Sequence, residues 1–192
     1  MPLTLTTRLE AVNTMLGTIG ESPVNSLTNT TADAALASTL LDETSREVQA
    51  AGWKFNIEKD VDFVRTTDGK ISLGQNILRF DVDPVLYQDV DPVQRGAELY
   101  DAKGHSYVFP RDLKAEVVYL LSFEQLPEQA RRYITVRASR IFQARFVGSV
   151  QLDGFTRADE LAALASLQDA QAESADLTVF DNYDAARPLF RR

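Results

Sequence analysis

Hydrophobic spacing changes twice along this chain of 192 residues, and this change constrains the fold more than any other feature. Apolar residues recur at helical spacing near both ends, whereas short alternating runs separated by turn residues occupy the middle. Helices that flank a run of strands are typical of a segregated α+β fold. We therefore expect a four-helix bundle-like domain from residues 1–53 and 122–180, an inserted antiparallel β lobe at 54–121, and a C-terminal tail at 181–192.

Two helices are predicted in the N-terminal part, at about 7–19 and 31–51. Thr7 and Glu10 stand three residues apart at the start of the first helix, which is the spacing of a capping box. A glycine follows each helix and can adopt the left-handed conformation that ends a helix. One face of the second helix is expected to be buried: Ala37, Leu40, Leu41, Thr44, Val48 and Ala51.

Two more helices are predicted after the β lobe, at about 127–146 and 156–175. Pro127 suits the first turn of the earlier one. Its expected apolar side is Ile134, Ala138, Ile141, Phe142 and Phe146. The expected buried stripe of the last helix is Leu161, Leu164, Ala165, Gln168 and Ala172.

The β lobe is predicted to contain about 4 to 6 strands, a usual size for one sheet. Dipeptides such as Asp68-Gly69 and Asp83-Pro84 separate the alternating runs and favour turns. The runs are Asp62–Arg65, Ile71–Leu73, Ile77–Val82, Glu98–Tyr100, Ser106–Phe109 and Glu116–Leu121.

Charge and missing residue types narrow the possible chemistry. The net charge is −8, which argues against a free-standing nucleic-acid-binding domain, because phosphate binding needs a positive face. The sequence has no cysteine and one histidine, His105. Disulfides, thiolate sites and cysteine nucleophiles are therefore excluded, a zinc site of the usual kind is not expected, and a Ser-His-Asp triad would have to use His105. We expect no metal and no cofactor.

No segment of the sequence indicates a membrane protein. Residues 1–8 lack the apolar core of a signal segment, and no apolar run approaches the ~18 residues that span a bilayer. We expect no membrane association, with synthesis and residence in the cytosol unless other machinery carries the protein.

An acidic repeat is the strongest candidate for chemistry. Asp81-Val82-Asp83-Pro84-Val85 recurs eight residues later as Asp89-Val90-Asp91-Pro92-Val93. Paired carboxylates can bind a hard cation or act as acid and base in glycoside cleavage. The alternative is two strand ends, each followed by a proline-directed turn. The glycine and terminal glutamate of a calcium-binding EF-hand loop are absent.

Aromatic and arginine side chains provide candidates for packing and subunit contacts. Trp53 follows a helix end beside Gly52 and is expected to anchor a core. Asn56 either caps a turn or faces a neighbouring subunit. Arg145 lies among apolar residues and would need a carboxylate partner if buried, from the bundle or from the next subunit. The candidates for subunit or bundle contacts are Trp53, Arg137, Arg140, Arg145 and Phe180.

Four stretches carry a combination of residues in a distinctive order and spacing. They are Ala11-Val12-Asn13 with Leu16, Ile19-Gly20-Glu21, Pro23-Val24 and Leu27; Asp33-Ala34-Ala35; Gly52-Trp53 with Phe55-Asn56; and Arg132-Tyr133-Ile134 with Ala138-Ser139-Arg140, Phe142, Arg145 and Gly148. Together they resemble the tail tubular protein A family of short-tailed bacteriophages. The β lobe and the tail match this family least clearly.

The resemblance implies a structural protein of the virion tail and not an enzyme. Family members form a ring of twelve copies between the capsid portal and the nozzle-forming tail tubular protein B, with tail fibres attached nearby. DNA leaves the capsid through the lumen of the ring, so we expect the lumen to be lined with Asp and Glu, which repel DNA. The protein would be in the host cytoplasm during assembly.

Two other functions remain open on the residues alone. Carboxylates of the β lobe favour a tail-associated glycan hydrolase, since tails meet cell-surface polysaccharide. A DNA-binding module is the other alternative, and its affinity would fall steeply with salt. The segment 177–192 is apolar without a period, so it is either frayed or docked on a partner; in an adaptor we expect docking.

Overall fold

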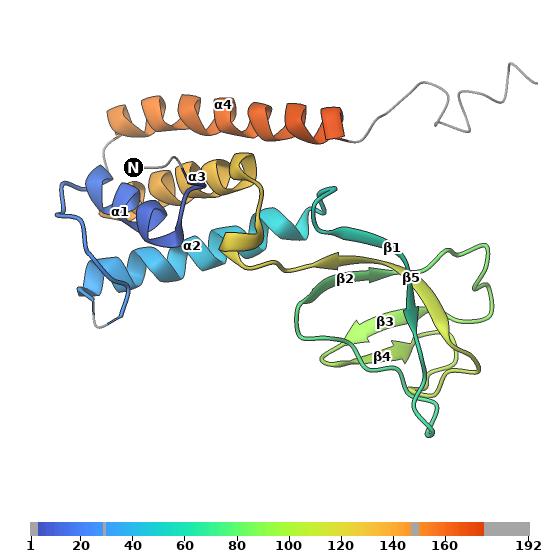
Figure 1. Ribbon diagram of the computed structural model, residues 1–192. Coiled ribbons are helices and arrows are strands. Elements are labelled where there is room, and N and C mark those ends of the chain that lie inside the picture. The colour runs from blue at the N-terminus through green and yellow to red at the C-terminus, as the bar shows by residue number, and fades with distance from the viewer. Residues whose placement is uncertain (1–3, 29, 147–149, 175–192) are drawn as a thin grey trace, which may run out of the picture. The chain divides into compact units, whose positions relative to one another are not determined.

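The structure is a computed structural model that describes residues 4–28, 30–146 and 150–174. It contains α helices and two small antiparallel sheets, so the predicted α+β class is confirmed (Figure 1). The chain forms two compact units, Met1–Leu41 with Pro127–Arg192 and Asp42–Leu126. The four-helix arrangement and the domain limits expected from the sequence stay predictions.

The helices begin and end close to the predicted residues, with one exception. They are α1 (Arg8–Thr18), α2 (Ala32–Ala50), α3 (Glu128–Phe146) and α4 (Val150–Ser174). Thr7 caps α1: its hydroxyl accepts from the backbone N–H of Glu10, whose carboxylate accepts from the N–H of Thr7. Gly20 follows α1 with a φ of 81°, the left-handed conformation that glycine adopts without strain. The exception is α4, which starts six residues earlier than expected.

The helical unit has its own apolar core. In this unit α3 packs against both α1 and α4. The carboxylate of Glu128 accepts from the backbone N–H of Thr6, and the Arg131 guanidinium donates to the carbonyl of Thr6 at 2.7 Å. These bonds fix the chain that enters α1 onto the start of α3. The buried apolar side chains include Val12, Met15, Leu16, Ala37, Leu40, Ile134, Ala138, Phe142, Ala163 and Leu167.

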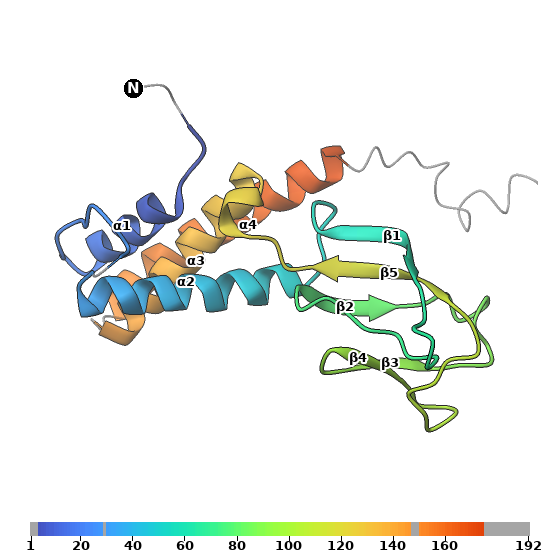
Figure 2. The same ribbon diagram turned by 60° about the horizontal axis from the view of Figure 1, so that its bottom comes forward.

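The β unit holds a three-stranded sheet in the order β1-β5-β2 and a two-stranded sheet of β3 and β4 (Figure 2). The strands are β1 (Ile57–Phe63), β2 (Ile77–Asp81), β3 (Pro92–Arg95), β4 (Glu98–Asp101) and β5 (Leu113–Tyr119). All pairings are antiparallel. The core between them is Ile71, Leu73, Ile77, Val90, Leu99, Phe109, Leu113, Ala115 and Val117.

Two of the predicted strands are wrong, and one strand was not predicted. The runs 71–73 and 106–109 contribute isolated bridges, Ser72 to Glu98 and Ser106 to Asp101, and no strand. The missed strand, β3, starts at Pro92 and pairs with a single neighbour. Proline is tolerated there because it lies at the first residue of an edge strand, where no ladder N–H is needed.

The buried face of α4 differs from the predicted one, whereas Ile134, Ala138 and Phe142 of α3 are buried as predicted. On α4, Glu160, Ala163 and Leu167 are buried, whereas Leu161 from the expected stripe is 62% exposed. On α3, Arg145 lies on the exposed side, so its predicted place on a buried apolar face is wrong. On α4 the difference arises because Glu160 faces α3 and accepts from Arg137 and Arg140, an ion cluster described below that no apolar period reveals.

Candidate functional site

The acidic repeat forms the loop between β2 and β3, and two of its carboxylates shape that loop. Asp83 Oδ1 accepts from the N–H of Val85 at 2.8 Å. The Asp83 carbonyl accepts from the N–H groups of Leu86 and Tyr87. Asp89 pairs with Arg111, whose guanidinium lies 5.1 Å from the ring centre of Tyr87. Both carboxylates therefore have structural partners, as the turn interpretation of the repeat requires.

Asp101, which was not among the residues selected from the sequence, anchors this loop through hydrogen bonds to its backbone. It is 5% exposed, and its Oδ1 accepts from the backbone N–H of Asp91 at 2.8 Å and of Lys103 at 3.0 Å. Burial acts to raise the pKa of Asp101, but N–H donors from Asp91, Gly104 and Lys103 outweigh it and hold the pKa below its ordinary value. The carboxylate thus ties the β2–β3 loop to the turn after β4.

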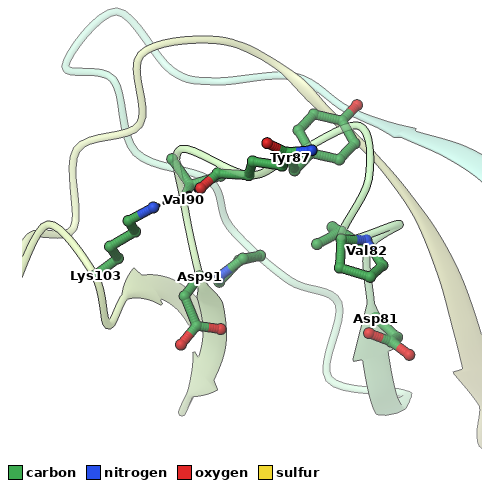
Figure 3. A pocket seen from close by; sticks show the side chains of 9 residues that line it. Asp81, Val82, Tyr87, Val90, Asp91 and Lys103 are labelled. Atoms are coloured by element: carbon green, nitrogen blue, oxygen red, sulfur yellow. Dashed lines mark hydrogen bonds between the residues drawn. The ribbon is translucent and has the colours of Figure 1, made fainter.

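The tied segments enclose an open hollow of about 540 Å³ (Figure 3). Its apolar surface comes from Val82, Pro84, Tyr87, Val90 and Pro92, and its charged groups are Asp81, Asp91 and Lys103. Figure 3 shows the carboxylates of Asp81 and Asp91 on the same side of the loop. The Lys103 ammonium donates to the carbonyl of Gln88. The hollow combines an apolar surface with acidic groups at its rim.

The described residues show where the candidates for metal binding and acid–base chemistry lie. In residues 4–28, 30–146 and 150–174 no three His, Asp or Glu side chains come together as metal ligands would. His105 is exposed in a turn with a φ of 50°. No hydrogen bond within the described chain orients its ring, whereas general-base work needs an oriented partner. No helix of the described chain is long and apolar enough to cross a membrane.

A polar network joins the end of α2 to β5 within the β unit. The side chain of Gln49 pairs with the backbone of Leu121, accepting from its N–H at 2.8 Å and donating to its carbonyl at 3.0 Å. Asn56 is 2% exposed; it accepts from the N–H of Trp53 and donates to the carbonyls of Gln49 and Tyr119. Asn56 therefore closes the turn after α2, one of the two roles predicted for it.

Trp53 is half-buried beside this network. Its indole N–H donates to the carbonyl of Val48 at 2.7 Å, and its ring lies parallel to that of Phe55, with ring centres 6.4 Å apart. The indole therefore covers the end of α2.

Two of the candidate arginines meet one carboxylate between α3 and α4. Glu160 accepts from Arg137 Nη1 at 3.2 Å and from Arg140 Nε, and Arg137 also donates to the hydroxyl of Tyr133. The Glu160 side chain is 11% exposed. The structure thus places Arg137 and Arg140 inside the helical unit, and Arg145 on its surface. Phe180 lies outside the described residues.

An aromatic and cationic array covers one side of the β3–β4 hairpin. The Arg95 guanidinium lies 3.5 Å from the ring centre of Tyr100, which contacts Tyr107 edge to face at 5.0 Å. Lys70 lies 5.8 Å from the Tyr107 ring and pairs with Glu98. This array could not be predicted from the sequence because its members come from three separate segments.

Comparison with known proteins identifies the class of protein. Residues 9–177 match a family model described as tail tubular protein. The chain is therefore a structural protein of a bacteriophage tail. It belongs to the tail tubular protein family, which confirms the resemblance seen in the sequence.

One curated relative is similar over most of the chain. It is tail tubular protein A of Klebsiella phage KP34, which is 31% identical over 128 residues. The alignment covers 66% of this chain and 66% of the relative, so the chain spans somewhat less than two thirds of that protein's length. Family membership supports a place in the virion tail.

Proposed function

We propose that this protein is a ring-forming adaptor that joins the capsid portal to the tail nozzle and forms part of the conduit for DNA ejection. The match to the tail tubular protein family over residues 9–177 carries this proposal. In the proposed assembly, about twelve copies form the ring, tail tubular protein B binds one side, and tail fibres attach nearby. The protein would assemble in the host cytoplasm and act in the virion.

The helical unit offers two different surfaces that a ring can use. A closed ring needs head-to-tail contacts, in which one patch on a subunit meets a different patch on the next. Leu36 on α2 is 48% exposed and Leu161 on α4 is 62% exposed, both among small or polar neighbours. We propose that these two faces meet between copies, with Arg145 at the end of α3 as a further contact.

The first experiment is assembly with portal. We expect the purified protein to form large rings on portal particles, visible by electron microscopy and as a fast component in sedimentation. Leu161→Asp should prevent ring formation while leaving the helices folded, because changes at exposed positions usually alter stability by less than about 0.5 kcal/mol. Val64→Asp, at a 70% exposed valine of the β unit, is the matched control and should assemble.

One result would contradict the adaptor, and a second would contradict the proposed contact through α4. One is a protein that stays monomeric and ignores assembled portal. The other is a Leu161→Asp variant that assembles as well as the Val64→Asp control, which would remove the α4 face from the interface. We also propose an acidic lumen, and a ring structure with a lumen dense in Lys and Arg would refute that part.

A tail-associated glycan hydrolase is the second candidate, favoured by one observation: Asp81 and Asp91 share the open hollow. The test is turnover of capsular and cell-wall glycan by the protein and by the Asp81→Asn, Asp83→Asn, Asp89→Asn and Asp91→Asn variants. Turnover that disappears with Asp81→Asn or Asp91→Asn would support an enzyme. Equal background in all five proteins would dispose of it.

A further inference from the structure

The residues that line the hollow of the β unit favour a particular kind of ligand. Val82 and Pro84 line it and remain accessible to water, and the carboxylates of Asp81 and Asp91 are exposed beside them. An apolar peptide flanked by cationic side chains would cover the apolar surface and pair with the carboxylates of Asp81 and Asp91. Its shape is also set in advance, because Asp101 fixes both Asp91 and Lys103 through their backbone N–H groups.

The same chain contains a segment of that kind in residues 185–192, which read Ala-Ala-Arg-Pro-Leu-Phe-Arg-Arg. Three of these eight residues are arginine and none is acidic, in a chain whose net charge is −8. Pro188, Leu189 and Phe190 lie between the arginines. Proline fixes its own φ and disfavours helix at the residue before it, so less conformational entropy is lost when such a segment binds in an extended form.

We propose that the hollow lined by Asp81, Val90 and Asp91 is a binding site for residues 185–192 of this chain. Pro188, Leu189 and Phe190 cover the apolar surface, and the arginines lie beside the carboxylates. This interaction goes beyond the adaptor function and stands without it.

The length of the chain permits the contact from a neighbouring copy. The described residues stop at Ser174 at the end of α4, and the eighteen residues that follow can span about 60 Å when extended. A tail from one subunit can therefore reach a β unit of another. Such an exchange of segments would link subunits without enlarging the contact between their folded parts.

A cross-linking assay on the full chain tests the site, and the absence of native cysteine makes it specific. Gln88→Cys places a thiol at the hollow, and Ala186→Cys places one beside the tail residues. We expect the pair to form a disulfide under mild oxidation at least about 5-fold faster than a control pair of Gln75→Cys with Ala186→Cys, because local binding raises the effective concentration of the thiols. Gln75 is an exposed glutamine of the same unit that does not line the hollow.

Charge variants in the cross-linking chain test the recognition. Asp81→Asn with Asp91→Asn should slow the cross-link by about 5-fold, because exposed ion pairs each contribute modestly to binding. Asp60→Asn with Asp68→Asn removes the same charge outside the hollow and should change the rate little. A cross-linked dimer on a denaturing gel identifies the tail of a second copy, and a fast-migrating monomer identifies the tail of the same copy; both support the site. Equal rates for the Gln88→Cys and Gln75→Cys pairs would overturn it, as would equal effects of the two charge variants.

Discussion

Asn56→Ala tests whether the polar network at the end of α2 stabilises the β unit. The Asn56 side chain makes three hydrogen bonds of 2.8–3.0 Å and is 2% exposed. Each such bond contributes about 1 kcal/mol, and partners left buried without a replacement add to the cost, so we expect a loss of about 3–5 kcal/mol. This is a large part of the about 5–15 kcal/mol by which ordinary domains are stable.

Urea unfolding followed by tryptophan fluorescence measures this loss. Trp53 is the single tryptophan of the chain and donates its indole N–H to Val48, so its emission reports on the same part of the β unit. The midpoint should fall while the dependence of the unfolding free energy on urea stays the same. Asn76→Ala, at an exposed asparagine before β2, is the control. A loss below about 1 kcal/mol, or equal losses in the two variants, would refute the reasoning.

Asn56→Asp should make the stability of the β unit depend on pH. An aspartate there would face two carbonyl oxygens in a buried place, so its pKa in the folded state should rise above the unfolded value of about 3.9. The variant should therefore lose stability as the pH rises above about 4 and recover part of it on acidification, since only the protonated acid can donate to a carbonyl. A variant whose stability relative to the parent does not change with pH would contradict this sign.

Three further outcomes are expected. Glu160→Gln should destabilise the packing of α4 on α3 by about 1–3 kcal/mol and speed hydrogen exchange in α4, whereas the exposed Glu173→Gln should not. Because the pKa of Asp101 is lowered in the folded state, its carboxylate stabilises the fold at pH values above the unfolded pKa of about 3.9. This stabilisation is lost as the pH falls through the folded-state pKa. The difference in urea midpoint between Asp101→Asn and the parent should therefore shrink in acid. Gly104→Ala should disturb the same turn, because its Cβ would overlap Asp101 Oδ2, and a parent-like midpoint would contradict that.

The sequence predicted those elements whose signals are local. The capping box at Thr7 and the glycines after α1 and α2 depend on neighbouring residues, and the helix ends they predict agree with the structure within one or two residues. The change from helix to strand after Trp53 was also predictable, because the spacing of apolar residues changes there.

The remaining features depend on contacts between distant segments. The stripe predicted for α4 is wrong because Glu160, a charged residue, turns inward to meet Arg137 and Arg140, and an apolar period cannot show that choice. Asp101 was missed for a similar reason: its donors come from the backbone of Asp91 and of the following turn, and backbone groups leave no mark in a sequence. The acidic repeat indicated the correct loop, but the residue that ties the loop to the turn after β4 lies ten positions after Asp91.

The edge of the three-stranded sheet limits how copies of this protein can join one another. β1 lies at the end of the order β1-β5-β2, and its exposed positions include Glu58, Lys59, Asp60 and Asp62. A register shift interrupts the strand at Asp60, which has a φ of 57°. Charges and irregular backbone on an edge strand oppose the addition of another strand. Copies at high concentration are thus kept from joining through β1, sheet to sheet, into fibres.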